Sequence, residues 1–408
     1  MFTLKSLLTP LFFSLFIYLE YFDLTNSLLN TLFVIVAFYN VLLLSRRELF
    51  ATGFITSLLW FWWIGYSFVY YDLIYMIPVI LICIGFIYGV LFYIIGIFSN
   101  IFFKVLYIFL LSFIEPFGFN WFKIELPFVY SYIGSSKIEF LMFLIIMAVF
   151  ITIKEKQNIY MAISGYIISL FLIIYYNTVN LQQKDLSVND LKIFMNQTNI
   201  DQDKKWKGEN RNKIVDNNFK SINKAISKGY DLIVFPETSF PLVLNRNSKI
   251  QERLIEKSYE ISIVLGSLYK KDGLYYNSTY MFENGKVEVA HKVVLVPFGE
   301  AVPMPEKIRN WINDMFYDGA KDYEVAENPT TFNIKGTKFR NSICYEATTD
   351  KIYENLDTKY VLALSNNAWF TPSTEPALQK ILLQYYANKY DLVIYSVTNK
   401  SKSGIIQP

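Results

Sequence analysis

Long apolar runs fill the first part of the chain. A bilayer core needs about 20 apolar residues in a helix, and runs close to that length recur up to residue 177. They predict membrane-spanning helices at 4–20, 26–44, 49–70, 73–95, 97–114, 137–153 and 158–177. We therefore expect a transmembrane domain of about seven helices over residues 1–180.

Cationic side chains fall in alternate connections between these predicted helices. If the N-terminus is cytoplasmic, the side chains that share its side of the membrane are Lys5, Arg46, Arg47, Lys104, Lys154 and Lys156. The positive-inside rule therefore predicts a cytoplasmic N-terminus. An odd number of crossings then delivers residue 178 to the extracytoplasmic side.

The pattern changes at about residue 185, where the spanning runs stop and charged residues and asparagine become frequent. Helices are predicted at 211–229 and 376–390 from apolar periodicity and from a proline at the start of the second. Short β-rich runs predict buried strands at 191–197, 231–237, 261–268, 339–346, 360–367 and 391–399. Strands interleaved with helices indicate an α/β domain with a mixed or parallel sheet over residues 185–408.

Composition narrows the classes of function. The chain is 53% hydrophobic, and its net charge of +3 is too small to indicate a nucleic-acid partner. The two cysteines, Cys83 and Cys344, cannot form a disulfide framework, and Cys83 lies in an apolar run where it reads as a packing residue. The single histidine, His291, excludes a zinc site with several histidine ligands. We expect no metal and no cofactor.

Polar residues collect where the β-rich runs of the second part end. Glu237 ends one run, Lys292 and Glu300 lie in a loop after another, and Cys344 ends a third. Reactive groups gather at the carboxyl ends of strands in such sheets. A thiolate is a nucleophile whose pKa a nearby cation lowers, and a carboxylate can move its proton. A lysine can stabilise the oxyanion of a tetrahedral intermediate.

The segments "VFPET", "HKVVLVPFGEAVP" and "ICYE" resemble the Glu–Lys–Cys motifs of the nitrilase superfamily. Together with the apolar first part and with "SNNAWF" and "YYNS", they are most similar to its membrane branch, the apolipoprotein N-acyltransferases. The resemblance covers essentially the whole chain. It implies a membrane α-helical bundle followed by an α/β nitrilase-like domain, an α-β-β-α sandwich, outside the cytoplasm.

Carried over residue by residue, the resemblance makes Glu237 the general base and acid, Lys292 the oxyanion-stabilising cation and Cys344 the acylated nucleophile. The supporting or substrate-binding residues that it implies are Glu300, Tyr345, Glu346, Asn277, Trp206, Trp369 and Phe370, the last two in a mobile aromatic loop beside the acyl-chain entrance. Structural roles remain open for Glu300 and Glu346 as ion-pair partners, and for Tyr345, Trp369 and Phe370 as packing residues. A dyad of Cys344 with His291 is disfavoured, because neighbours in an extended segment point opposite ways.

The implied reaction moves an acyl chain from a phospholipid, with phosphatidylethanolamine as donor, to a cysteine thioester. The chain then passes to the N-terminal amino group of a diacylglyceryl-cysteine lipoprotein. The implied location is the bacterial inner membrane, with the catalytic domain on the periplasmic side. Two alternatives remain: a membrane-tethered amidase with water as acceptor, and a non-enzymatic receptor or scaffold. The family also has a C-terminal membrane helix, whereas this sequence stops at "SKSGIIQP", either because the protein is naturally short or because the sequence is incomplete.

Overall fold

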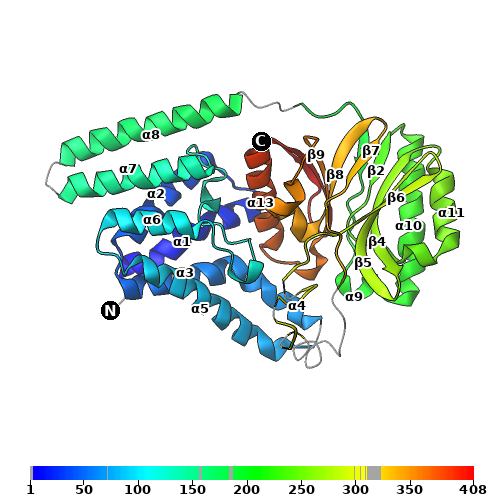
Figure 1. Cartoon of the computed structure of the whole chain (residues 1–408), viewed down its shortest axis with the longest axis horizontal. Coiled ribbons are helices and arrows are strands. Elements are labelled where there is room, and N and C mark those ends of the chain that lie inside the picture. Colours follow the sequence, from blue (N-terminus) through cyan, green and yellow to red (C-terminus); the bar gives the residue numbers. More distant parts are fainter. Residues whose placement is uncertain are drawn as a thin grey trace. The chain divides into compact units, whose positions relative to one another are not determined.

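The computed structural model describes residues 3–70, 72–155, 159–182, 187–297, 299–303, 305–307, 309 and 323–408. The chain divides into two compact units (Figure 1). The first comprises Met1–Asp185 and Pro372–Lys389, and the second comprises Leu186–Thr371 and Tyr390–Pro408.

The first unit is helical, and each range predicted to span the membrane contains a helix. The helices are α1 (Leu4–Tyr21), α2 (Ser27–Leu43), α3 (Arg46–Phe61), α4 (Gly65–Val69), α5 (Ile77–Ile95), α6 (Ile101–Leu111), α7 (Lys137–Glu155), α8 (Ile159–Gln182) and α13 (Glu375–Tyr390). Among the described residues, four helical stretches are long and apolar enough to cross a membrane: Leu4–Tyr21, Arg46–Val69, Ile74–Ile95 and Ile101–Gly118. The membrane character is confirmed, and the number of crossings stays a prediction.

Glycines let α3 and α5 approach closely. A Cβ on Gly53 of α3 would lie 2.4 Å from the carbonyl oxygen of Tyr88 in α5. On the facing helix, Cβ atoms on Gly85 and Gly89 would lie 2.7 and 2.9 Å from the rings of Phe54 and Phe50. Small residues at such contacts allow helix backbones to pack tightly without a hydrophobic drive from water.

Helix α13 follows a strand of the second unit in sequence but groups with the first unit. Its Lys380 forms an ion pair with Glu20, at the end of α1. Its Tyr385 hydroxyl donates to Glu125 Oε1 at 2.9 Å, and Glu125 is fully buried in the ordered segment between α6 and α7. Polar contacts therefore tie this late helix to the N-terminal helices.

The second unit contains two sheets. The first has the order β1-β2-β4-β5-β6, with β3 also paired to β4, and the second has the order β11-β10-β9-β8-β7. The strands are β1 (Ile193–Met195), β2 (Leu232–Val234), β3 (Phe240–Val243), β4 (Ser262–Lys271), β5 (Leu274–Glu283), β6 (Lys286–His291), β7 (Thr331–Ile334), β8 (Thr337–Ile343), β9 (Tyr360–Asn366), β10 (Val393–Asn399) and β11 (Gly404–Ile406). The helices of this unit are α9 (Gln202–Lys205), α10 (Gly208–Ser227) and α11 (Ser248–Lys257).

Alternation along the strands builds the layers. Leu232 and Val234 of β2 pack with Leu362 and Leu364 of β9, so the two sheets lie face to face. Ile233, between them in sequence, packs on the opposite face with residues of α10 and α11. These helices cover the outer face of the first sheet (Figure 1). Alternate side chains of a strand point to opposite faces of the sheet, and here both faces are buried. The strands are therefore continuous apolar runs in the sequence.

Each range predicted as a strand or helix within residues 185–408 contains one, although several strand ends differ from the prediction by two or three residues. The range 339–346 was expected to be extended throughout, but β8 stops at Ile343 and a 3₁₀ turn begins at Cys344. The cause is local, because Cys344 has a φ of 55° and an extended strand cannot continue through the left-handed region.

Candidate active site

Cys344 lies at the tip of β8, where the chain leaves the second sheet. Its φ of 55° is uncommon for a residue other than glycine, and the side chain is half-buried. Strained backbone of this kind collects at functional sites, where the surrounding structure holds it in place. The strand therefore ends before this residue, which is partly accessible.

Glu237 follows the end of β2, a strand in the interior of the first sheet. Its Oε1 accepts from Asn277 Nδ2 at 2.7 Å, and its Oε2 accepts from the Asn366 backbone N–H at 3.0 Å. Only 8% of its surface is exposed. Since Asn277 belongs to the first sheet and Asn366 ends β9 of the second, hydrogen bonds from both sheets orient this carboxylate.

Lys292 follows β6 and is fully buried. Its Nζ lies 2.6 Å from Oε2 of Glu300, which also accepts from the Val296 N–H at 2.9 Å. Glu300 Oε1 accepts from Asn277 Nδ2 at 3.1 Å, so one amide links the two carboxylates. The predicted residues Glu237, Asn277, Glu300 and Lys292 are thus brought together in one group, in which Glu300 is partly exposed and the other three are buried.

The charge state of Lys292 follows from its neighbours. Burial alone would lower the pKa of its ammonium, but Glu300, Glu237, Cys344 and Glu346 together hold the pKa above its ordinary value. The lysine is therefore a cation at neutral pH. This electrostatic coupling also places Cys344 and Glu237 in the field of the same ammonium.

Glu346 joins the cysteine turn to the lysine segment. One oxygen accepts from the Ile343 N–H at 2.7 Å, and the other accepts from the N–H groups of Val293 and Val294 at 2.7 and 3.2 Å. Burial raises its pKa to about 7, although Lys292 and the three N–H donors oppose the shift. Its contacts link the residue before Cys344 to the two residues after Lys292.

Both units match known protein families. Residues 1–175 match the model of the apolipoprotein N-acyltransferase integral membrane domain, and residues 195–399 match that of the carbon-nitrogen hydrolases. An apolipoprotein N-acyltransferase of Wolinella succinogenes is 41% identical over 99% of this chain and 95% of its own length. The chain belongs to the apolipoprotein N-acyltransferase family. The recognition and the fold class predicted from the sequence are confirmed.

Other relatives of this chain carry the same family name. An apolipoprotein N-acyltransferase of Campylobacter jejuni is 33% identical over 96% of this chain and 86% of its own length. A solved CN-hydrolase superfamily protein of Xanthomonas campestris aligns with a TM-score of 0.40 at 15% identity, covering 54% of this chain and 83% of that protein.

The family resemblance also predicted site roles for three aromatic residues. Tyr345, Trp369 and Phe370 all lie near strand ends of the second sheet. Tyr345, next to Cys344, is 2% exposed and therefore buried. Trp369 and Phe370 follow β9 in and just after a short 3₁₀ turn, and both are half-buried. A packing role suits Tyr345, while the partial exposure of the other two is compatible with either a lid or a packing role.

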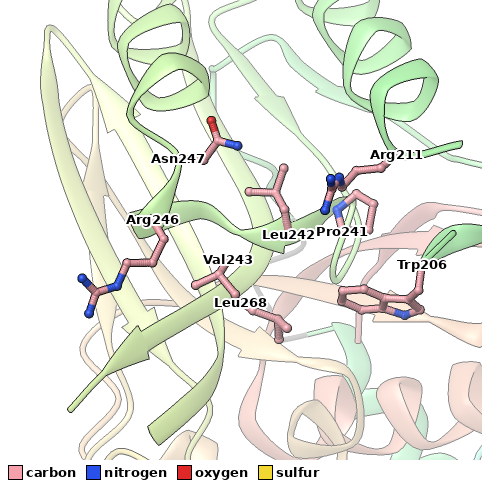
Figure 2. A pocket seen from close by; sticks show the side chains of 8 residues that line it. All are labelled: Trp206, Arg211, Pro241, Leu242, Val243, Arg246, Asn247 and Leu268. Atoms are coloured by element: carbon pink, nitrogen blue, oxygen red, sulfur yellow. The ribbon is translucent and has the colours of Figure 1, made fainter. Parts of the chain in front are cut away.

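Trp206, the remaining residue taken from the apolipoprotein N-acyltransferase resemblance, lies on a surface hollow of about 360 Å³. Apolar side chains of β3 and β4 form part of the lining, and Arg211, Arg246 and Asn247 contribute polar groups (Figure 2). Trp206 is 43% exposed. None of the buried residues around Glu237 and Lys292 lines this hollow, so Trp206 stands apart from them.

The imidazole of His291 contacts Ser278 and two tyrosine rings. Its Nδ1 lies 2.8 Å from Ser278 Oγ, and its ring lies against the rings of Tyr269 and Tyr276. Burial lowers its pKa, assisted by Lys271, so the ring is neutral. These partners agree with the expectation that His291 forms no dyad with Cys344.

Sequence reasoning missed Lys205, the last residue of α9. It is 1% exposed, and its Nζ donates to the Glu237 carbonyl oxygen at 3.1 Å and to Thr238 Oγ1 at 2.6 Å. The segment "DQDKKWKGEN" is typical of a solvated charged surface, so composition alone gave no reason to expect a buried ammonium there. Its place one residue before Trp206 was the only signal.

Proposed function

We propose that this chain transfers an acyl chain from a phospholipid to the N-terminal amino group of a lipoprotein. The observation that carries the proposal is the 41% identity to an apolipoprotein N-acyltransferase over nearly the full length of both chains. The buried residues Glu237 and Lys292, with Cys344 close enough to Lys292 for their charges to interact, support it, because acyl transfer through a thioester needs those chemical functions.

The first half-reaction acylates the cysteine. The thiol proton passes to the Glu237 carboxylate, and the sulfur attacks the ester carbonyl carbon of the phospholipid. The C–O bond of the ester then breaks, and the proton moves from Glu237 to the departing lysophospholipid oxygen. The acyl chain remains on Cys344 as a thioester, and Glu237 is again a carboxylate.

The second half-reaction uses an amine. The free α-amino group of a diacylglyceryl-cysteine attacks the thioester carbonyl, and Glu237 takes a proton from the nitrogen. The C–S bond breaks, and the sulfur recovers that proton. The products are an N-acylated lipoprotein with three acyl chains and the free enzyme, so the same carboxylate acts as base and acid in both halves.

Lys292 supplies the electrostatic part of this scheme. Both tetrahedral intermediates carry an oxyanion, and a fixed cation in a buried site stabilises it more than water would. The ion pair with Glu300 and the fully buried position fix the ammonium before the substrate arrives. Asn277 supports both carboxylates through a single amide nitrogen.

The membrane helices give the reaction a location. Both substrates are anchored in a bilayer, and removing an acyl chain from lipid costs about 0.8 kcal/mol for each CH₂ group exposed to water. We propose that the protein lies in the bacterial inner membrane with the second unit on the periplasmic side, and that phosphatidylethanolamine is the donor. The alternate placement of cationic residues among the connections supports this orientation.

Intact-protein mass spectrometry tests the proposal. Purified protein mixed with phosphatidylethanolamine should gain the mass of one acyl chain, Cys344→Ala should abolish that gain, and Cys83→Ala should preserve it. Adding a diacylated lipopeptide should then remove the acyl mass and transfer it to the peptide. Acyl mass that persists without Cys344 contradicts the nucleophile assignment, and release at the same rate without an amine favours an amidase.

A further inference from the structure

Asn277 carries a buried side-chain oxygen to which no described residue donates. Its Nδ2 donates to Glu237 Oε1 at 2.7 Å and to Glu300 Oε1 at 3.1 Å, so both N–H bonds of the amide are used. Asn277 is 3% exposed, and within the part of the chain that the structure describes its Oδ1 accepts no hydrogen bond. Burying a carbonyl oxygen without a donor costs free energy. An oxygen kept in this state beside two carboxylates points to a donor that a substrate supplies.

The orientation of this amide follows from its neighbours. Ionised carboxylates accept hydrogen bonds and donate none, so the atom that faces Glu237 and Glu300 must be the nitrogen. A flipped amide would place Oδ1 against both carboxylates, which would repel it. The oxygen is therefore the atom of Asn277 that remains for another molecule. Because it belongs to the same amide as Nδ2, a single nitrogen atom of a substrate can contact both this oxygen and the Glu237 carboxylate.

Asn277 and Lys292 are neighbours across the ladder between β5 and the end of β6. The Lys292 backbone N–H donates to the Asn277 carbonyl oxygen at 2.9 Å, and the adjacent pair of this ladder is Ser278 with His291. Their side chains share a partner, because Glu300 accepts from Asn277 at one oxygen and lies 2.6 Å from Lys292 Nζ at the other. The site thus holds a cation and, next to it, a free acceptor.

We propose that Asn277 Oδ1 accepts a hydrogen bond from the amine that attacks the thioester in the second half-reaction, which makes Asn277 a catalytic residue of amine transfer. The inference rests on the proposed function. A primary amine has two N–H bonds and one lone pair. With one N–H bonded to Glu237 and the other to Asn277, the lone pair remains free to attack the thioester carbonyl carbon. The ester group that reacts in the first half-reaction has no N–H or O–H to offer this oxygen.

The hydrogen bond to Oδ1 becomes stronger as the amine reacts. The C–N bond forms and the C–S bond breaks, while Glu237 takes a proton from the nitrogen and passes it to the sulfur. The amide of Asn277 gains and loses nothing. Because the nitrogen acquires positive charge during the attack, its N–H bond to Oδ1 becomes charge-assisted. The contact therefore stabilises the transition state more than the bound amine.

The test measures each half-reaction as a single turnover in a Cys83→Ala background, by intact-protein mass spectrometry. The gain of acyl mass from phosphatidylethanolamine gives the first rate, and transfer from the isolated acyl-enzyme to saturating diacylated lipopeptide gives the second. Both halves need Glu237, but only the second needs Oδ1. Asn277→Ala should therefore slow the second half about tenfold more than the first, the effect of one hydrogen bond. Equal slowing of the two halves overturns the proposal.

Asn277→Asp is the matched control, because it keeps an oxygen acceptor at this position and loses the N–H bonds of the amide. The variant removes the support of Glu237 and Glu300, which both halves share, so it should slow the two halves by similar factors. An excess loss in the second half as large as that of Asn277→Ala would assign the effect to Nδ2 and would also overturn the proposal.

A modified acceptor gives a test that needs no variant at Asn277, in case the substituted protein does not fold. A lipopeptide with an N-methylated α-amine keeps one N–H, which Glu237 takes, and has none left for Asn277. Cys83→Ala protein should transfer its acyl chain to this peptide about tenfold more slowly than to the primary amine. The comparison is divided by the ratio of the uncatalysed reactions of the two peptides with a soluble thioester, and a corrected ratio of one contradicts the proposal.

Failure of this inference differs from failure of the proposed function. If the protein gains and transfers an acyl chain but Asn277→Ala slows both halves equally, acyl transfer stands and the role of Oδ1 falls. If phosphatidylethanolamine gives no acyl mass, p-nitrophenyl palmitate is used to load Cys344. Selective slowing of amine transfer in Asn277→Ala then keeps the inference while the phospholipid donor falls. The absence of a thioester with either donor overturns both.

Discussion

At the scale of single residues, two turns of the site contain a residue in the left-handed backbone region. Cys344 has a φ of 55° and Thr238 a φ of 45°, and this region costs a residue with a Cβ roughly 1–2 kcal/mol. Contacts nearby must offset that cost. Glu346 does so at Cys344 by binding the N–H of the preceding Ile343, and Lys205 does so at Thr238 by binding its hydroxyl.

Gly266 of β4 gives the Glu237 turn its space. A Cβ there would lie 2.5 Å from the Thr238 nitrogen and 2.7 Å from the Glu237 Cα. Because both atoms belong to the backbone, Gly266→Ala should displace the turn and slow acyl-enzyme formation at least tenfold, a cost of about 1.4 kcal/mol or more. Gly404→Ala is the matched control, since nothing lies within 4 Å of its Cβ position. Equal acylation rates in the two variants would contradict this account of the turn.

Glu346 should make stability depend on pH. Burial raises its pKa from 4.5 to about 7, so the folded protein keeps a proton that the unfolded chain releases between these values. By linkage this group's contribution to the free energy of unfolding falls by about 1–3 kcal/mol as pH rises from 4.5 to 7. Glu346→Gln removes this titration. The melting temperature of the wild type in detergent should therefore exceed that of the variant by more at pH 5 than at pH 7, and the opposite order would refute the assignment.

Elements were easier to predict than contacts, for a physical reason. Apolar runs and their periodicity reflect burial directly, so the helices of the first unit and the strands that hold Glu237 and Cys344 could be read from the sequence. Strand β3 was missed because "FPLV" contains a proline and directly follows a turn. Lys205 was missed because burial of a charged side chain depends on distant partners, which local sequence does not show.

The contacts of α13 could not be predicted either, because its apolar residues do not show which surface covers them.

The Tyr385 hydroxyl of α13 binds Glu125, which also pairs with Lys137, and Glu125 is fully buried. Tyr385→Phe leaves that carboxylate without one donor and should lower the free energy of unfolding by about 1–3 kcal/mol. The control is Tyr160→Phe, because Tyr160 is 85% exposed. Melting curves of the two variants in detergent would measure the difference, and matching curves would remove the structural role of this hydrogen bond.

The orientation of the whole molecule in the membrane follows from charge rather than from any one helix. The cationic connections predict that the N-terminus is cytoplasmic and that residues beyond 178 are not. Alkaline phosphatase folds only outside the cytoplasm, so its fusion after residue 200 should be active, and the same fusion after residue 46 should be inactive. Activity of the second fusion alone would reverse the predicted topology.

The membership of α13 in the first unit has a consequence for how the protein is made. The chain leaves the first unit after Asp185, re-enters it at Pro372 and leaves again after Lys389. A ribosome releases residues in order from the N-terminus. The helical unit therefore stays incomplete until nearly all strands of the second unit have been synthesised, and the parallel pair β9 and β10 cannot close until α13 has been made between them. Synthesis that stops early leaves both units unfinished, so maturation of the two is tied to a single late event.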